Sequence, residues 1–244
     1  MSPRVTLAVA GRVLRQLRRD RRTVAMLLAV PVLLQTLLWW VYLDAEPVFD
    51  RVGPGLLAVF PFVVMFLVTS VTTLRERSSG TLERLLTLPV GRLDLLLGYA
   101  LAFGLAAVVQ AALAVGVSVG LLGLEVAGPT WLLAVVAVLD AVLGTALGLL
   151  VSAFARTEFQ AVQFMPALVL PQLLLCGLLL PREQMPTALS RVSDALPLSY
   201  AVDAMAALSR STDTGGVGAD LAVVSAFVVA ALAVGAATLR RRTA

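Results

Sequence analysis

ERSSGTLERLLTLPVGRLDLLLG, residues 76–98, is a compact stretch of charged and polar residues between two long apolar runs. An α-helix needs roughly 20 consecutive apolar residues to cross ~30 Å of hydrocarbon, and the runs on either side are that long. Long apolar runs joined by short charged connections predict a chain that crosses a membrane several times. The charged stretch is then a part that meets water or another protein.

The composition places the chain in a membrane without the help of any motif. Hydrophobic residues make up 59% of the 244 residues, charged residues make up 14%, and the mean hydropathy is +0.95. A soluble domain usually carries about 25% charged residues, so we predict an integral membrane protein. The basic charge comes from arginine alone, because the sequence has neither lysine nor histidine. We attribute this bias to a GC-rich bacterial genome and expect no nucleic-acid partner.

The missing residue types exclude several chemistries. Without lysine there is no GxxxxGK[ST] loop to bind the phosphates of ATP. Without histidine, and with Cys176 as the one cysteine, Ser-His-Asp catalysis and zinc sites are excluded. We therefore expect no catalytic residue, no metal site and no cofactor bound by this chain.

Six apolar runs are long enough to span a bilayer. We predict a single all-α membrane domain over residues 1–244, with six transmembrane helices. Their predicted ranges are 23–43, 55–74, 95–122, 131–154, 161–180 and 220–239.

The arginines predict the orientation of these spans. Segments on the side of the N-terminus carry fifteen arginines, and segments on the other side carry four. Positively charged residues concentrate on the cytoplasmic side of membrane proteins. We therefore predict a cell (inner) membrane protein with both termini in the cytoplasm, where the charged stretch also lies.

The first 22 residues have the pattern of an amphipathic helix. Val9, Val13 and Leu17 share one face of a helical wheel, and arginines occupy the other. This pattern is typical of a helix lying in the membrane interface with arginines on lipid phosphates, and we predict such an elbow helix before the first span. The alternative is a positively charged anchor with no further role. The arginines concerned are Arg12, Arg15, Arg18, Arg19 and Arg22.

The second connection, residues 75–94, contains a short helix in this prediction. Gly80 permits a turn, and a helix begins near Thr81. Pro89 ends it near Leu88, because proline disfavours helix in the residue before it. Such a helix of about two turns is unstable alone in water, so it must dock on its own bundle or on a partner protein. The alternative is an amphipathic loop on the lipid surface.

Two segments carry recognisable motifs. Residues 76–89 have the form E-x-x-x-G-T-L-E-x-L-L-x-x-P, and residues 171–205 combine a glycine near a span end, a proline-bracketed segment and Pro-Leu-Ser-Tyr. With these motifs on opposite sides of six spans, the chain resembles the type-2 ABC transporter permeases, the family that includes daunorubicin-resistance-type export permeases. The matching residues are Glu76, Gly80, Thr81, Leu82, Glu83, Leu85, Leu86 and Pro89 in the first motif, and Gly177, Pro181, Pro186, Pro197, Leu198 and Tyr200 in the second.

The resemblance implies a division of labour between chains. A separate ABC ATPase subunit, in two copies, would bind ATP and Mg and would dock on the short helix of the second connection, here called the coupling helix. The coupling residues would be the first motif together with Arg84. A second permease chain, identical or related, would complete the transport pathway. Spans one, two and five would line this pathway. The substrate would be an amphipathic drug, an antibiotic or a lipid-like molecule moved out of the cell, as in multidrug efflux and antibiotic resistance.

The resemblance also suggests that residues 181–219 return toward the membrane on the outer side. Residues 187–196 and 199–209 each read as a short helix with apolar residues on one side. We expect these re-entrant helices to cap the pathway. An exposed surface loop is the alternative.

Some polar and small residues within the spans have two readings. Asp140 is either a contact for substrate or protons, since ionisable residues are costly inside a membrane, or a hydrogen-bonded packing residue. The glycine pairs 144/148 and 116/120 predict close helix packing. The polar residues that we assign to the pathway are Gln35, Asp140, Gln163 and Gln172.

Two other classes of function remain open at this stage. A secondary transporter driven by an ion gradient normally has several intramembrane charges, and only Asp140 qualifies here. A scaffold protein without transport activity is the second alternative.

Overall fold

The computed structural model describes residues 2–79 and 91–238, and every regular element in this part of the chain is a helix, which confirms the all-α prediction. The predicted coupling helix, with Gly80 and Pro89 at its ends, lies outside the described residues. The elements are α1 (Pro3–Arg19), α2 (Arg21–Val41), α3 (Glu46–Ser78), α5 (Arg92–Gly120), α6 (Thr130–Ser152), α7 (Glu158–Leu175), the 3-10 helix η1 (Arg182–Gln184), α8 (Thr187–Asp194), α9 (Pro197–Arg210) and α10 (Val217–Thr238).

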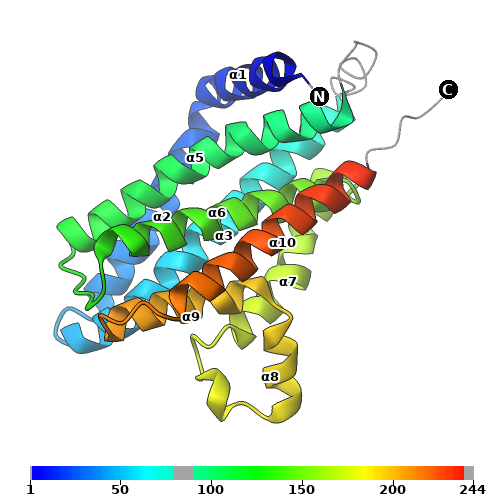
Figure 1. The fold of residues 1–244 in the computed structure, drawn as a ribbon. Coiled ribbons are helices and arrows are strands. Elements are labelled where there is room, and N and C mark those ends of the chain that lie inside the picture. The colour runs from blue at the N-terminus through cyan, green and yellow to red at the C-terminus, as the bar shows by residue number, and fades with distance from the viewer. Residues whose placement is uncertain (1, 80–90, 239–244) are drawn as a thin grey trace.

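Among the described residues, five helices are long and apolar enough to cross a membrane: α2, α3, α5, α6 and α10. These long helices pack against one another and form a helical bundle (Figure 1). The chain is therefore a multi-pass membrane protein, but the predicted count of six spans is not confirmed, because α7 does not reach the length and apolarity of the others.

The helix α7 differs most from its predicted span of 161–180. It has 18 residues with Pro166 and Pro171 inside it, and it ends at Leu175. Two residues later Gly177 has φ +90°, a conformation that residues with a Cβ rarely adopt. The apolar residues continue past Gly177. A span predicted from hydropathy therefore runs beyond the end of the helix.

The helix α3 differs from its predicted span in the other direction. It begins at Glu46 rather than at residue 55 and runs for 33 residues, with Pro47 in its first turn. Proline fits the first turn of a helix because its missing N–H has no partner there anyway. The first two turns of α3 carry Asp50 and Arg51. Because of these charged residues, the hydropathy of this helical segment is like that of a loop.

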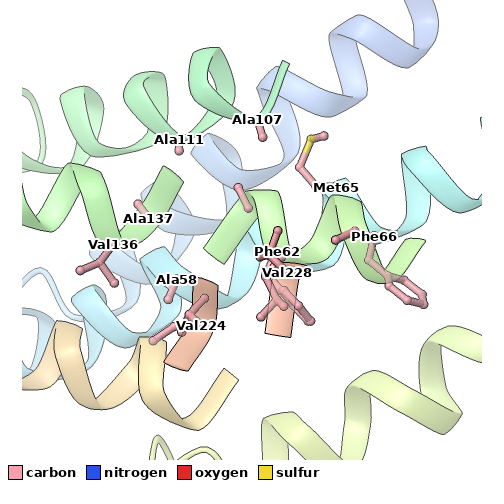
Figure 2. Packing of buried hydrophobic residues seen from close by; sticks show 14 of the residues in the cluster. Ala58, Phe62, Met65, Phe66, Ala107, Ala111, Val136, Ala137, Val224 and Val228 are labelled. Atoms are coloured by element: carbon pink, nitrogen blue, oxygen red, sulfur yellow. The ribbon is translucent and has the colours of Figure 1, made fainter. Parts of the chain in front are cut away.

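The core of the bundle is the contact between α3 and α6. A Cβ atom added to Gly144 would collide with the carbonyl oxygen of Phe62, and one added to Gly148 would lie 2.7 Å from the carbonyl oxygen of Phe66. Residue numbers rise together along the two helices, so α3 and α6 run parallel with their backbones in contact. Figure 2 shows side chains from α3, α5, α6 and α10 meeting around this seam.

The second glycine pair does not pack as expected. Among the described atoms, none lies within 4 Å of a Cβ atom added to Gly116 or Gly120, and both residues are exposed on α5. The prediction of close packing was wrong for this pair, because spacing along a helix says which residues share a face and not what that face meets.

We predict that Gly144→Ala destabilises the protein by about 1–3 kcal/mol, the usual cost of inserting atoms into a filled core. Gly116→Ala is the matched control, since the same methyl group enters open space and favours the helix by up to about 1 kcal/mol. Thermal unfolding of the purified variants in detergent measures both effects. Equal losses of stability in the two variants would contradict the packing described here.

Candidate functional site

A polar cluster of three residues, here called the base cluster, holds the last turns of α3 just before residues 80–90, which contain the predicted coupling helix and are here called the coupling segment. Its members are Arg12, Glu76 and Tyr99. Glu76 lies in the last turns of α3 and is only 4% exposed. Its Oε2 atom accepts hydrogen bonds from Arg12 Nη2, at 2.7 Å, and from the Tyr99 hydroxyl. Arg12 Nη2 also donates to Tyr99 Oη at 2.8 Å. The cluster thus ties α1 and α5 to α3 just before the coupling segment begins.

A second contact fixes the beginning of α1 on α5. Asp94 Oδ1 accepts hydrogen bonds from the backbone N–H of Ser2, at 3.0 Å, and from Thr6 Oγ1, at 3.2 Å. A Cβ atom on Gly98 would lie 2.6 Å from Val9 Cβ, so the absence of a side chain at Gly98 lets α1 approach α5 closely.

The apolar face of α1 therefore packs largely on protein. Val9, Val13 and Leu17 are buried, whereas the expected interfacial helix would have buried this face in lipid. Arg12 turns inward to the base cluster, and the other predicted elbow arginines Arg15, Arg18, Arg19 and Arg22 are exposed. Their contact with lipid phosphates stays a prediction.

The end of α3 is also tied to α6 and α7. Arg75 forms a paired contact with Glu158 at the start of α7, with N–O distances of 3.0 and 3.1 Å. The hydrogen bond from Arg75 lowers the pKa of Glu158. Arg77 Nη1 donates to the carbonyl oxygen of Ser152 at the end of α6, at 2.8 Å. Four helices thus hold the end of α3 from different sides.

The glutamines expected in the pathway occupy different environments. Gln35 is buried and donates to the carbonyl oxygen of Gly53 at 3.0 Å, which links α2 to α3. Gln172 is 6% exposed, and its Oε1 accepts from the backbone N–H of Leu198 at 3.4 Å, at the start of α9. Gln163 is exposed on α7. The structure therefore does not bring these three residues together.

Asp140 is fully buried in α6, one turn before Gly144. In the described part of the chain, neither carboxylate oxygen has a hydrogen-bond partner. Burying an unpaired carboxylate is costly, so nothing here stabilises its charged form. Its role in transport stays a prediction.

The opposite end of the bundle contains a cluster of charged residues that the sequence analysis did not single out. Arg182 of η1 forms ion pairs with both Asp194 of α8 and Asp203 of α9. Its guanidinium lies 5.4 Å from the centre of the Tyr200 ring. Burial raises the pKa of Asp203, and the hydrogen bond from Arg182 opposes this rise.

The two short helices of this outer segment are packed very differently. In α9, Leu198, Met205 and Leu208 are fully buried, and the helix contacts α3, α6, α7 and α10. In α8 only Ser193 is buried, and the helix projects from the end of the bundle away from α1 (Figure 1). The helix α9 therefore packs into the bundle and α8 does not, and the re-entry of either helix into the membrane stays a prediction.

The prolines of the second motif mark the boundaries of these helices. Pro181 precedes η1, Pro186 precedes α8, and Pro197 is the first residue of α9. The Tyr200 hydroxyl donates to the carbonyl oxygen of Asp194 at 2.7 Å. The motif therefore encodes the turns and one contact of the outer segment.

Comparison with known proteins decides the family. The sequence model of the family described as "ABC-2 type transporter" matches residues 4–208, from the start of α1 to the end of α9. The chain belongs to the ABC-2 type transporter family. The resemblance inferred from the two motifs is thereby confirmed, and both motifs lie inside the matched region.

Individual ABC-2 relatives agree with this assignment. The probable multidrug ABC transporter permeases YbhS and YbhR of Escherichia coli K12 are 29% identical over 156 residues and 28% identical over 152 residues, which cover 64% and 62% of this chain. ABC transporter G family member 20 of Dictyostelium discoideum is 27% identical over 156 residues, 64% of this chain and 21% of its own length. The matched part is 41% of each E. coli protein, so the chain spans about two fifths of these relatives.

Sequence reasoning missed several residues that this ABC-2 chain uses at its two ends. Tyr99 and Asp94 stand at the start of an apolar helix, and Arg182 and Asp203 lie in the outer segment. Their partners are 23 residues away or more at the first end and 12 to 21 residues away at the second. The one signal of these contacts that the sequence offered was a hydrophilic residue at the end of a predicted span.

We predict that Glu76→Gln and Arg12→Gln each destabilise the permease by about 1–3 kcal/mol, because each removes the charge-assisted hydrogen bond between Arg12 and the buried Glu76 carboxylate. The double variant should lose less than the sum of the two, since residues in one network are not independent. Thermal unfolding in detergent measures all three. Arg15→Gln is the control, because Arg15 is exposed and, among the described residues, bonds only to a carbonyl one turn earlier. Additive losses would refute the direct pairing.

Proposed function

We propose that this chain is the membrane-spanning subunit of an ATP-driven ABC exporter that moves an amphipathic substrate out of the cell. The observation that carries this proposal is the base cluster, which joins the end of α3 to α1 and α5 immediately before the coupling segment. Family membership supports the transporter assignment, and the base cluster supports a mechanical input at this end of the bundle.

The end of α3 is held firmly enough to transmit a movement in this proposal. A force on a short segment moves a distant helix only when the joint between them does not bend. Here α3 is continuous from Glu46 to Ser78, and its last turns are tied to α1, α5, α6 and α7. A displacement of the coupling segment would therefore shift α3 with its neighbours rather than bend its end.

Glu76 has a different part in this proposal from the one expected from its motif. Its carboxylate is buried among residues of its own chain, so it would position the coupling segment and not touch the ATPase. The residues proposed to contact the ATPase are then those beyond the described end of α3: Thr81, Leu82, Glu83, Arg84, Leu85 and Leu86. A leucine face with charged edges suits docking in a groove.

The partner in this proposal is a separate ABC ATPase subunit, present in two copies, that binds ATP and Mg. The chain has no lysine for a P-loop. The arginine distribution supports placing the coupling segment and both termini in the cytoplasm.

A second permease chain would cover exposed apolar side chains on α2 and α7. Leu33, Leu37 and Trp40 of α2 are 63%, 60% and 71% exposed, and Leu174 of α7 is 55% exposed. Closed two-fold assemblies are the commonest solution for such chains. Either a second copy of this chain or a related permease would serve, with α2, α3 and α7 nearest the pathway.

The proposed substrate is an amphipathic drug, antibiotic or lipid-like molecule. The names of the E. coli relatives YbhS and YbhR refer to multidrug transport, and the bundle interior is mainly apolar. Deleting this gene together with a neighbouring ATPase gene, followed by drug-susceptibility profiling, would identify the substrate.

We predict that Leu82→Asp and Leu85→Asp abolish co-purification with the ATPase and ATP-dependent transport. A charge on the leucine face would be buried without a partner at the docking surface. Leu43→Asp is the matched control, since Leu43 is an exposed leucine just after the C-terminal end of α2. Unchanged transport in the Leu82 and Leu85 variants would refute the coupling proposal.

Asp140, which has no hydrogen-bond partner in the described part of the chain, gives one reason to test an ion-driven transporter as well. We predict that Asp140→Asn keeps ATP-dependent transport in inside-out vesicles, and that a proton gradient without ATP drives none. Substrate movement driven by the gradient alone, and lost in Asp140→Asn, would decide for the secondary transporter.

A further inference from the structure

The helices α6 and α10 pack side by side (Figure 1), and an apolar groove lies between them. The groove has a volume of about 520 Å³. It is lined by five residues of α6 between Ala134 and Val142 and, from α10, by Leu221 and Ser225. Volumes of ~300–1,000 Å³ are typical of small-molecule sites. None of the described lining residues belongs to α2 or α7, the helices of the proposed contact with a second permease chain.

The wall of the groove consists of hydrocarbon side chains and one hydroxyl group. That hydroxyl belongs to Ser225 and donates to the carbonyl oxygen of Leu221, one turn earlier, at 2.7 Å. Its hydrogen is therefore already bonded within α10. Both helices are long and apolar enough to cross a membrane, and Val135 and Ser225 on the wall are exposed. The groove thus opens toward lipid and suits an occupant that is apolar along its length.

The groove is about as long as one leaflet of a bilayer is deep. From Ala134 to Val142, α6 rises by about 12 Å, at ~1.5 Å per residue, and half of the ~30 Å hydrocarbon core is ~15 Å. One turn before Val135, the side chain of Trp131 is 67% exposed, and tryptophan is enriched at the level of the lipid head groups. The groove therefore runs from the head-group level toward the middle of the membrane. A transmembrane helix of another chain would need a contact surface across both leaflets.

A basic residue lies near the head-group end of the groove. The backbone N–H of Gly128 donates to the carbonyl oxygen of Leu208 at 2.8 Å, so the end of α9 lies against the chain that enters α6. Arg210 follows two residues later and is exposed. Among the described residues it makes none of the ion pairs, and a guanidinium group is well suited to bind a phosphate. Asp220 precedes Leu221 in the chain but lines the junction of α10 with α6 and α9 and not the groove.

We propose that this groove binds one acyl chain of a membrane phospholipid, whose phosphate contacts Arg210. The chain runs along α6 from the level of Trp131 to Val142. It packs against α10, which buries only five of its 22 residues within the protein, and so stabilises the contact between α10 and α6. The site depends on the chain spanning a membrane and does not depend on the proposed export function.

The first experiment fills the groove. Ser225→Leu and Ala134→Leu each place a larger side chain in the groove from one of its walls. Each should weaken binding of the first molecule of dioleoylphosphatidylglycerol roughly tenfold or more, because inserting atoms into an occupied space costs free energy. Native mass spectrometry of the purified chain in detergent measures this affinity. Ala226→Leu is the matched control, since Ala226 is an exposed neighbour that does not line the groove, and its affinity should equal that of the wild type.

A second experiment tests the phosphate contact. Arg210→Gln should weaken binding of dioleoylphosphatidylglycerol about fivefold, since a basic residue near the membrane surface attracts anionic lipid. It should not change binding of dioleoylglycerol, which has the same acyl chains and no phosphate. Arg191→Gln, which changes an exposed arginine of α8, should alter neither affinity. Equal affinity of the wild type and Arg210→Gln for the phospholipid would overturn the contact with Arg210.

Thermal unfolding provides a readout that does not depend on mass spectrometry. A ligand that binds only the folded state raises the unfolding temperature. Added dioleoylphosphatidylglycerol should therefore raise it in the wild type and in Ala226→Leu, and should raise it less in Ser225→Leu. Equal increases in all three proteins would overturn the assignment of the lipid to this groove.

The same variants separate a lipid from other occupants. If Ser225→Leu dissociates dimers of the chain and leaves lipid binding unchanged, a second copy occupies the groove and the proposal fails. If the wild type binds the lipid at this groove but transports no substrate with its ATPase, the export proposal fails and the lipid site stands. If transport is ATP-dependent and lipid binding ignores Ser225→Leu, the lipid site fails and the export proposal stands.

Discussion

The contact between the backbones of α3 and α6 is the constraint on which the other helices depend. At Gly144 and Gly148 there is no side chain between the two helices, and α6 lies against the carbonyl groups of Phe62 and Phe66. Lipid tails are as apolar as leucine, so close packing has to replace the hydrophobic effect as the attraction between membrane helices. The seam provides such packing, and α5, α9 and α10 then pack around α3 and α6.

The polar contacts are concentrated at the two ends of this bundle and follow from the same physics. Inside the bundle, Gln35 and Gln172 bond to neighbouring backbone, and Asp140 has no partner among the described residues. At one end, Glu76 and Arg75 tie α3 to its neighbours. At the other end, Arg182 ties the outer segment together. A bundle with a closely packed interior and with ion pairs between helices at both ends can transmit a displacement from one side of a membrane to the other.

The two ends differ in how firmly they are built. Around Glu76 the joints connect long helices whose apolar faces are buried as well, including α1 on α5. Around Arg182 the joint holds α8, which has one buried residue and no apolar face in the core. The polar contacts at the first end therefore accompany buried apolar surface, whereas those at the second hold a helix that buries little of its own.

Particular residues show how far the sequence could be read. Apolar run length was sufficient for an all-α membrane chain, the two motifs for its family, and Pro186 for the start of α8 at Thr187, because these depend on composition or on neighbours in the chain. The helix α9 begins at Pro197, two residues before its predicted start at residue 199. The beginning of α3 at Glu46 and the end of α7 at Leu175 were missed, since hydropathy does not record where a helix leaves the apolar layer or where a glycine turns. The inward turn of Arg12, the open space at Gly116 and the bridge made by Arg182 were decided only by the tertiary structure. Each depends on a partner from another helix, and one-dimensional spacing contains no information about which face meets which neighbour.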